Sequence, residues 1–417
     1  MKSLFVLSLT QNYLTGPIPV SLGNLTNLTR LYLDNNYLSS YIPQEIGNII
    51  SLIFVTLCTN NLTGNLSKLD AIELHDNKLV GSIPLELGNL INLLSLDVSI
   101  NHLTGLIPST LGKLIKLTQL KLDNNDLTGS IPATLGNLSN LVNVLVSGNE
   151  ISGFIPQGIT NLTKLGSISL SRNKFSGYLP QDICLGGLLK IFTANDNHFI
   201  GPVPKVLKNC RKLTRLRLNQ NRFSGNISDA FGENPDLVYI DLSYNNLYGK
   251  LLPICGECQN LTSIKASNNL ISGLIPPELG EIAQLQTLDL SSNHLLYEIP
   301  KELGKLRSLV NLNLSDNHLS GRIPTEIGSL TNLEYLDLST NSLVGPIPKE
   351  VSSCSSLIYL SIRRNMINGS IPFEICSLMN LQILLDLSQN NLTDSIPSQL
   401  QKLQKLENMN LSHNMIF

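Results

Sequence analysis

The stretch LYLDNNYLSSYIP, residues 31–43, returns as LDLSTNSLVGPIP at residues 336–348, and copies of it occur about every 24 residues between them. In each copy, leucines or other apolar residues alternate with variable residues on the way to an asparagine. Because successive side chains of a strand point to opposite faces, this alternation predicts one short strand per copy, with one buried face. The marker asparagines are Asn12, Asn36, Asn60, Asn77, Asn101, Asn125, Asn149, Asn173, Asn197, Asn221, Asn245, Asn269, Asn293, Asn317, Asn341, Asn365, Asn390 and Asn414.

A period of this length with the consensus LxxLxLxxNxLxGxIP is typical of the leucine-rich repeat. We therefore predict an α/β-type solenoid, a horseshoe or superhelix of 24-residue repeats with a parallel sheet on its concave face. One domain over residues 1–417, with 18 turns, is expected, because stacked turns enlarge the core lengthwise. The marker asparagine should point inward and bond the backbone of adjacent turns, since an unpaired buried amide is costly.

One turn departs from the period, because only 17 residues separate Asn60 from Asn77. Leu66 and Leu69 can still point inward, but the return segment is too short to match its neighbours. We expect a dent of low local stability at residues 61–77.

Both ends of the sequence are repeat-like. The start, MKSLFVLSLTQN, has the look of a signal peptide, but its leucines fall in register with the next turn and no small-residue cleavage site follows. Neither end has a paired-cysteine cap, and no stretch is long and apolar enough to span a membrane. We expect a segment from the middle of a longer protein, or a truncated product, without a signal peptide or transmembrane helix of its own.

Repeats such as LTGSIPATLGNLSNL, residues 127–141, resemble the extracellular domains of plant leucine-rich-repeat receptor-like kinases and receptor-like proteins. The resemblance covers nearly the whole chain. It implies a segment at the extracellular face of the plasma membrane that binds a secreted peptide on the concave face. It also implies a second partner, a shorter leucine-rich-repeat co-receptor kinase that approaches once the ligand is bound.

Charge and motifs exclude several other classes of function. A net charge of −2 with 14% charged residues gives no basic stripe for nucleic acid and no polybasic patch for membranes. No nucleophile motif, phosphate loop or HExxH is present, so we expect neither an enzyme nor a cofactor. His294 and His318 share one repeat position without a third ligand of fitting spacing, so no metal site is predicted.

The sharpest candidate site is RLRLNQNR, in which Arg215 and Arg217 are successive outward positions of one strand and Arg222 follows at the loop edge. Two guanidiniums on one face can hold one carboxylate with a geometry that lysine cannot copy. The pair looks like the RxR motif with which peptide-hormone receptors of this family hold the free C-terminal carboxylate of their ligand. Tyr239, one turn further, is a candidate wall beside that carboxylate. The alternative is a solvated basic strand.

An extended peptide held at this pair should run toward the N-terminal turns. There the outward residues are small and polar, which suits hydrogen bonds to a peptide main chain, although neutral filler is the alternative. The candidate ligand-binding residues on this path are Lys121, Ser167, Ser169, Thr193 and Asn195.

A second cluster comprises Tyr335 and Tyr359 in adjacent turns, with Arg363 close by. Tyrosine and arginine are common anchors of protein interfaces, so this is our candidate co-receptor site. Aromatic pairing that only stabilises the sheet is the alternative.

Cysteines and glycosylation sequons bear on the compartment. Cys184 with Cys210, and Cys354 with Cys376, lie in neighbouring turns and are candidate disulfides, although small buried thiols are the alternative. The CGEC motif at Cys255 lacks the strand and helix pattern of a redox protein. Twelve sequons favour secretion, at Asn24, Asn27, Asn61, Asn65, Asn137, Asn161, Asn226, Asn260, Asn313, Asn368, Asn391 and Asn410.

The favoured function is therefore recognition of an extracellular peptide. Two alternatives remain, an inhibitor of the polygalacturonase-inhibiting type, which shares this repeat and docks an enzyme on its concave face, and a truncated fragment without function.

Overall fold

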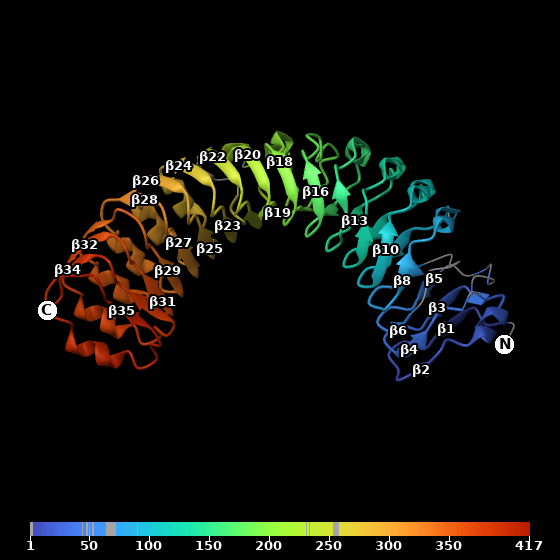
Figure 1. Cartoon of the computed structure of the whole chain (residues 1–417), viewed down its shortest axis with the longest axis horizontal. Coiled ribbons are helices and arrows are strands. Elements are labelled where there is room, and N and C mark those ends of the chain that lie inside the picture. The colour runs from blue at the N-terminus through green and yellow to red at the C-terminus, as the bar shows by residue number, and fades with distance from the viewer. Residues whose placement is uncertain are drawn as a thin grey trace. The chain divides into compact units, whose positions relative to one another are not determined.

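The computed structural model describes residues 3–43, 45–46, 49, 51, 54–63, 72–89, 91–230, 232, 234–252 and 258–417. The chain divides into two compact units, Met1–Ile200 (unit 1) and Gly201–Phe417 (unit 2), which Figure 1 colours from blue to green and from green to red. Several predictions fall outside the described residues, namely those for Asn65, Leu66, Leu69 and Cys255 and for most of the short turn. Among the described residues, no helix has both the length and the apolar character needed to cross a membrane.

Each turn begins with a short strand of the predicted alternating kind. In the turn of Asn101, Leu96 and Val98 are fully buried, whereas Ser95 and Asp97 lie on the opposite face. We call the outward side chains of these odd-numbered strands, and of the residues just after them, the strand face. In unit 1 the strands are β1 (Val6–Ser8), β3 (Arg30–Tyr32), β5 (Phe54–Thr56), β7 (Ile72–Glu73), β9 (Ser95–Asp97), β11 (Gln119–Lys121), β13 (Asn143–Leu145), β15 (Ser167–Ser169) and β17 (Ile191–Thr193). In unit 2 they are β19 (Arg215–Arg217), β21 (Tyr239–Asp241), β23 (Ser263–Lys265), β25 (Thr287–Asp289), β27 (Asn311–Asn313), β29 (Tyr335–Asp337), β31 (Tyr359–Ser361), β33 (Leu384–Asp386) and β35 (Met409–Asn410).

Within each unit these strands pair in parallel, each with the same position one turn on. In unit 2, for example, Arg215 lies opposite Tyr239 and Arg217 opposite Asp241. The leucine-rich-repeat solenoid predicted from the 24-residue period is therefore confirmed, and the register follows directly from that period.

The marker asparagine is the polar element that ties the turns together, as predicted. The Nδ2 of Asn101 donates to the carbonyls of Leu74, Val98 and Ser99 at 3.0, 3.1 and 3.0 Å, and its Oδ1 accepts from the Leu79 N–H at 3.0 Å. Leu74 and Leu79 belong to the preceding turn. One buried amide thus satisfies backbone groups of two turns, which is why almost no other residue can stand there.

The residue before each marker asparagine has a positive φ, a conformation that asparagine, aspartate and glycine tolerate best. Asn268 (φ 54°) and Gly148 (φ 65°) fit this rule. Ile100, with a φ of 53°, breaks it, because its branched Cβ crowds the backbone there.

A second strand follows the asparagine in most turns, which the repeat pattern alone did not predict. In unit 1 these strands are β2 (Thr15–Gly16), β4 (Tyr37–Ser40), β6 (Asn61–Leu62), β8 (Val80–Ser82), β10 (His102–Leu106), β12 (Asp126–Thr128), β14 (Ser152–Gly153), β16 (Lys174–Gly177) and β18 (His198–Gly201). In unit 2 they are β20 (Arg222–Asn226), β22 (Asn246–Lys250), β24 (Leu270–Gly273), β26 (His294–Glu298), β28 (His318–Ser320), β30 (Val344–Gly345), β32 (Met366–Gly369) and β34 (Asn391–Leu392).

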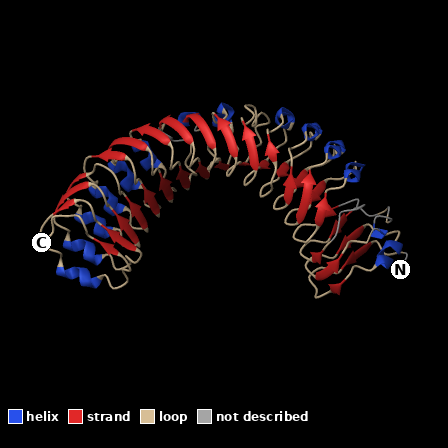
Figure 2. Ribbon diagram, viewed as in Figure 1, coloured by secondary structure: helices blue, strands red, loops and turns tan. Residues whose placement is uncertain are grey.

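In most turns the return segment is a short 3-10 helix that follows an Ile-Pro dipeptide, whereas η7 follows Val203-Pro204 and η8 follows Asn226. Proline favours this start because its fixed φ matches the residue before the helix, as at Pro300 (φ −62°). The helix glycine allows close stacking of turns, since a Cβ on Gly304 would lie 2.4 Å from the carbonyl oxygen of Glu326. Figure 2 shows these helices on a different side of each turn from the strand face. They are η1 (Val20–Asn24), η3 (Leu85–Asn89), η4 (Ser109–Lys113), η5 (Ala133–Asn137) and η6 (Gln157–Asn161) in unit 1, and η7 (Lys205–Asn209), η8 (Ile227–Asp229), η9 (Pro277–Glu281), η10 (Lys301–Lys305), η11 (Thr325–Ser329), η12 (Lys349–Ser353), η13 (Phe373–Ser377) and η14 (Ser398–Lys402) in unit 2.

Candidate ligand-binding site

The two predicted arginines share one strand and one face. Leu216 between them is buried, Arg215 is exposed and Arg217 is half-buried on β19. Their guanidinium carbons lie 4.9 Å (Arg215) and 6.0 Å (Arg217) from the centre of the Tyr239 ring. The predicted grouping of Arg215, Arg217 and Tyr239 is therefore what the structure shows.

No acid neutralises this pair among the described residues, because neither guanidinium has a hydrogen-bond or ion-pair partner there. The adjacent carboxylate of Asp241 is bonded elsewhere, to the Ser243 N–H at 3.1 Å and to the Tyr239 hydroxyl, which donates at 3.3 Å. The Nε of Arg217 is buried without an acceptor. A buried donor on a fixed cation favours an added anion, since an unmade hydrogen bond of this kind is costly.

The phenol of Tyr239 stays protonated beside the arginines. Burial, and next the charge of Asp241, raise its pKa, and the smaller opposing effects of Arg217 and Arg215 do not reverse this shift. The ring therefore offers the guanidiniums a neutral aromatic face, which is a favourable cation–π contact.

Arg222 is separate from this cluster. It begins β20 and is exposed at the edge of the turn. Within the described residues, no hydrogen bond, ion pair or ring contact joins it to the other two arginines.

Three further polar atoms beside the arginine pair lack partners. They are Asn219 Oδ1, Ser243 Oγ and Ser263 Oγ, on side chains of residues no more than 7% exposed. All three residues occupy outward positions after or within β19, β21 and β23. The alternating sequence pattern predicts that these residues lie on the strand face. It does not indicate that their polar atoms lack partners.

In unit 1, most of the predicted ligand-binding residues already bond to protein. Lys121 Nζ lies 3.1 Å from Asp97 Oδ2, and the hydroxyls of Ser169 and Thr193 share a hydrogen bond of 2.7 Å. Asn195 accepts a hydrogen bond of 2.6 Å from Ser171 and donates one of 2.5 Å to Asp196. Ser167 is half-buried on β15.

The candidate co-receptor cluster contains a tight aromatic stack. The rings of Tyr335 and Tyr359 lie 4.0 Å apart at 13°, and both hydroxyls donate to Asp337 Oδ2, at 3.5 and 3.3 Å. Burial is the largest cause that raises the pKa of both phenols, and hydrogen bonding with Tyr335 adds to the shift at Tyr359. Arg363 is exposed beside them. This is the geometry expected of cross-strand pairing, and the co-receptor role remains a prediction.

One of the two predicted disulfides is wrong. Cys354 and Cys376 are free, buried thiols. Cys354 follows η12 and its Sγ donates to the carbonyl of Ile327 at 3.2 Å, so it behaves as a small core residue. Cys184 and Cys210, in contrast, are both disulfide-bonded.

The described sequons lie at the surface to different degrees. Asn61, Asn313 and Asn410 are half-buried, and Oδ1 of Asn313 accepts from the backbone and the hydroxyl of Ser315 at 3.1 and 2.7 Å. The exposed sequons are Asn24, Asn27, Asn137, Asn161, Asn226, Asn260, Asn368 and Asn391.

The rings of His294 and His318 stack at 5.8 Å. Among the described residues, no three metal-ligating side chains come together.

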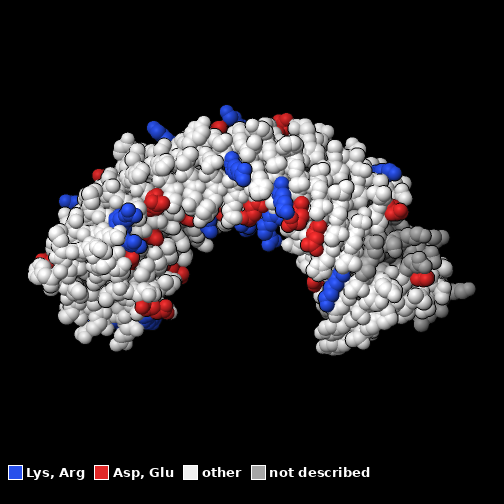
Figure 3. Space-filling model, viewed as in Figure 1, with Lys and Arg blue, Asp and Glu red and all other residues white. Residues whose placement is uncertain are grey.

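Charge is sparse on the molecule, as its composition indicates. Figure 3 shows isolated basic and acidic side chains on a surface that is otherwise uncharged. Any electrostatic recognition would therefore depend on local groups, of which the arginine pair is one.

Comparison with known proteins agrees with the repeat pattern. The leucine-rich-repeat family model matches residues 3–25, 27–49, 92–114, 116–138, 212–234, 260–282, 284–306, 356–378 and 383–403, and a model of two such repeats matches residues 307–349. No curated protein sequence gives a significant match.

Solved structures give a closer likeness. The ectodomain of the Arabidopsis thaliana membrane receptor kinase GASSHO1/SCHENGEN3, in complex with CASPARIAN STRIP INTEGRITY FACTOR 2, is 33% identical with a TM-score of 0.74, over 99% of this chain and 56% of that one. The ectodomain of the Arabidopsis receptor kinase HAESA, bound to an extended IDA peptide hormone, is 33% identical with a TM-score of 0.86, over 99% of this chain and 75% of that one. HAESA with IDA and the co-receptor SERK1 is 30% identical with a TM-score of 0.66, over 100% and 83%. The chain thus spans little more than half of the GASSHO1 ectodomain, and it belongs to the leucine-rich-repeat ectodomains of plant receptor kinases.

Proposed function

We propose that this chain is the ligand-recognition part of a plant receptor kinase and binds a secreted peptide on the strand face of unit 2. The GASSHO1 and HAESA ectodomains, each bound to its own peptide, support this class of ligand. The chain acts by binding rather than by catalysis. The sequons and the oxidised Cys184 and Cys210 fit a place at the extracellular face of the plasma membrane.

Arg215 and Arg217 hold the free C-terminal carboxylate of the peptide. The observation that carries this assignment is two guanidiniums directed over one tyrosine ring, without an acidic partner among the described residues. A carboxylate placed between them accepts charge-assisted hydrogen bonds from both forks, and Arg217 Nε gains the acceptor that it lacks. Tyr239 limits the space on the side of β21.

The polar residues of unit 1 have a supporting role in this proposal. Lys121, Ser169, Thr193 and Asn195 first stabilise neighbouring turns through their own bonds, and a peptide main chain competes with those bonds. Ser167 makes a further main-chain contact. We therefore expect smaller effects from these residues than from the arginine pair.

A bound peptide then promotes association with a shorter co-receptor kinase. The HAESA complex that contains SERK1 supports this second partner. Tyr335, Tyr359 and Arg363 supply the contact, with the stacked rings as a rigid apolar surface and Arg363 as its exposed cation. Arg222 is a peripheral contact for the peptide.

The role of the carboxylate can be tested without knowing the natural ligand. A pool of random 13-residue peptides, tethered at their N-termini, is offered to the protein once as free acids and once as C-terminal amides. We expect strong retention on the acid pool and at least tenfold less on the amide pool. Equal retention on both pools contradicts the proposal, and inhibition of a polygalacturonase by the same protein would favour the inhibitor alternative.

A further inference from the structure

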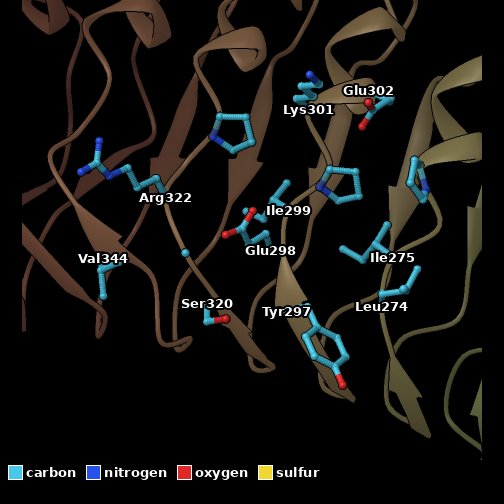
Figure 4. Close-up of a pocket in the computed structure, with 14 residues that line it drawn as sticks. Leu274, Ile275, Tyr297, Glu298, Ile299, Lys301, Glu302, Ser320, Arg322 and Val344 are labelled. Carbon is cyan, nitrogen blue, oxygen red and sulfur yellow. The ribbon is translucent and has the colours of Figure 1, made fainter.

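A groove on the flank of unit 2 lies apart from the strand face. Two adjoining hollows, of about 1060 and about 560 Å³, share Arg322 and run along the Ile-Pro segments of successive turns. Figure 4 shows the larger one, with Leu274 and Tyr297 on one side of Glu298 and Arg322 and Val344 on the other. Phe373 lines the smaller one and is 62% exposed.

Tyr297 occupies a backbone position where glycine stands in the flanking turns. Its φ is 70°, and the equivalent Gly273 and Gly321 have φ values of 86° and 74°. This left-handed region is strained for a residue with a Cβ. Burial does not offset this strain, because the tyrosine is 62% exposed. A strained, exposed aromatic of this kind points to a role in binding.

Tyr297 lines the groove beside a side chain from the preceding turn. In other turns that side chain lies against the glycine, so that a Cβ on Gly321 would be 2.6 Å from Glu298 Cγ and one on Gly345 would be 3.1 Å from Arg322 Cγ. Leu274, in the turn before Tyr297, is 49% exposed and forms one wall of the groove.

The groove offers no free strand edge to a ligand. β26 pairs with β24 on one side and with β28 on the other. Beyond β28, the N–H groups of Ser342 and Val344 donate to the carbonyls of Leu319 and Gly321, both at 2.8 Å. Pro300 and Pro324 line the floor and have no N–H. A peptide that needs main-chain pairing, as in β-augmentation, is therefore disfavoured.

We propose that this groove binds a proline-rich peptide in the polyproline II conformation. Such a helix rises about 3.1 Å per residue, so that prolines three residues apart are separated by about 9.3 Å on one side. Tyr297 and Val344 line the same hollow from turns two apart, and equivalent positions of two such turns are about 9.6 Å from each other at about 4.8 Å per turn. The two side chains can therefore each receive one proline of a P-x-x-P motif. Polyproline II ligands make no internal hydrogen bonds, and the hydroxyls of Tyr297 and Ser320 can donate to their carbonyls.

The charged side chains of the groove predict which residues the peptide carries between its two prolines. Arg322 and Glu298 have no ion-pair partner among the described residues, and they lie in adjacent turns between Tyr297 and Val344. An acidic residue facing Arg322 and a basic residue facing Glu298 match them. Lys301 and Glu302 at the rim are of opposite sign and favour neither charge.

The test uses the blocked peptide Ac-PPPKEPPP-NH2, which has no free carboxylate for the arginine pair on the strand face. Binding is measured by titration against the protein and two groove variants, Tyr297→Gly and Arg322→Gln. We expect Tyr297→Gly to weaken binding at least tenfold while its Tm stays the same or rises, because glycine relieves the strained backbone. Arg322→Gln should weaken binding of this peptide but not of Ac-PPPAAPPP-NH2.

Matched variants outside the groove serve as controls. Tyr248→Ala, on β22 and 53% exposed, and Arg307→Gln should bind as the parent does. No binding of the peptide, or equal binding by Tyr297→Gly and the parent, overturns the proposal. Binding of a glycine-serine peptide of equal length as tightly, or binding of an oligosaccharide that depends on Tyr297 in its place, also overturns it.

Discussion

The strand face around Lys121 in unit 1 and that around Arg215 in unit 2 have the same backbone but differ in how their polar groups are satisfied. In unit 1, Lys121 is paired with Asp97, and hydroxyls of neighbouring turns bond to one another. In unit 2, the guanidiniums of Arg215 and Arg217 lie over Tyr239 without an acid among the described residues, and nearby polar atoms are unpaired. Polar residues at equivalent positions therefore differ in how many hydrogen-bonding groups remain available to a ligand. Their bonding partners within the protein determine this number, rather than the residue types themselves.

The largest expected effect is on stability, and it tests whether the marker asparagines stabilise both units to the same extent. Asn101→Ala in unit 1 and Asn269→Ala in unit 2 remove the same buried amide, which bonds backbone groups of two turns. Each unpaired buried group costs about 1–3 kcal/mol, so both variants should lose comparable stability. Hydrogen exchange should show faster exchange in the two turns around each substitution. A loss of stability in only one of the two variants would mean that the marker asparagines contribute differently in the two units.

A smaller change in stability should distinguish the strand face of unit 1 from that of unit 2. Lys121→Ala leaves the buried carboxylate of Asp97 without its cation and should destabilise unit 1 by about 1 kcal/mol, a modest value because the lysine is partly exposed. Arg217→Ala removes a cation that has no ion-pair partner among the described residues. Its unfolding free energy should change by less than about 0.5 kcal/mol, because the loss of the cation–π contact with Tyr239 is offset by removal of the unpaired, buried Nε. Denaturation monitored by exchange in each unit measures both, and a large loss for Arg217→Ala would contradict the contrast.

The third effect depends on pH. Burial, and next the charge of Asp97, raise the pKa of Asp123 above its ordinary value of 3.8. Because the folded chain keeps this proton to a higher pH than the unfolded chain, stability falls as pH rises through the interval just above 3.8. Asp123→Asn should therefore be more stable than the parent at pH 7 and equal to it well below that interval. The equivalent position in unit 2 is Asn219, which is already neutral. A gain that persists at low pH would assign the effect to packing instead.

The smallest effect concerns the residue before the marker asparagine. Ile100 in unit 1 has a φ of 53°, whereas the equivalent Asn268 in unit 2 suits its φ of 54°. Ile100→Asn should stabilise unit 1 by about 0.5 kcal/mol, since asparagine tolerates this conformation and the isoleucine is 47% exposed. The reverse change, Asn268→Ile, should destabilise unit 2 by a similar amount. Thermal unfolding of both variants measures the pair, and shifts of the same sign would refute the explanation.

The fold was readable from the sequence because one physical rule repeats in every turn. Alternating leucines and an inward asparagine require the same backbone each time, so the register of Arg215 with Tyr239 followed from the spacing. The sequence also marks Tyr297, since LLYEIP lacks the glycine of its neighbours, but this departure from the repeat did not enter the predictions.

Contacts between side chains of adjacent turns could not be predicted from the sequence. The stack of Arg215 on Tyr239, the sharing of Asp337 by two tyrosines and the unpaired Asn219 depend on rotamers that the repeat does not specify. The cysteine prediction failed for Cys354 and Cys376 for a related reason. Lying in neighbouring turns does not direct two side chains toward each other, and both thiols are packed in the core.

We expect the arginine pair of unit 2 to bind a carboxylate through its geometry and not only through its charge. Replacing both residues by lysine, Arg215→Lys with Arg217→Lys, keeps two positive charges but removes the planar forks. Retention of this variant on the free-acid peptide pool separates the two effects. We expect at least tenfold weaker retention than the parent with an unchanged Tm, and equal retention would show that charge alone is enough.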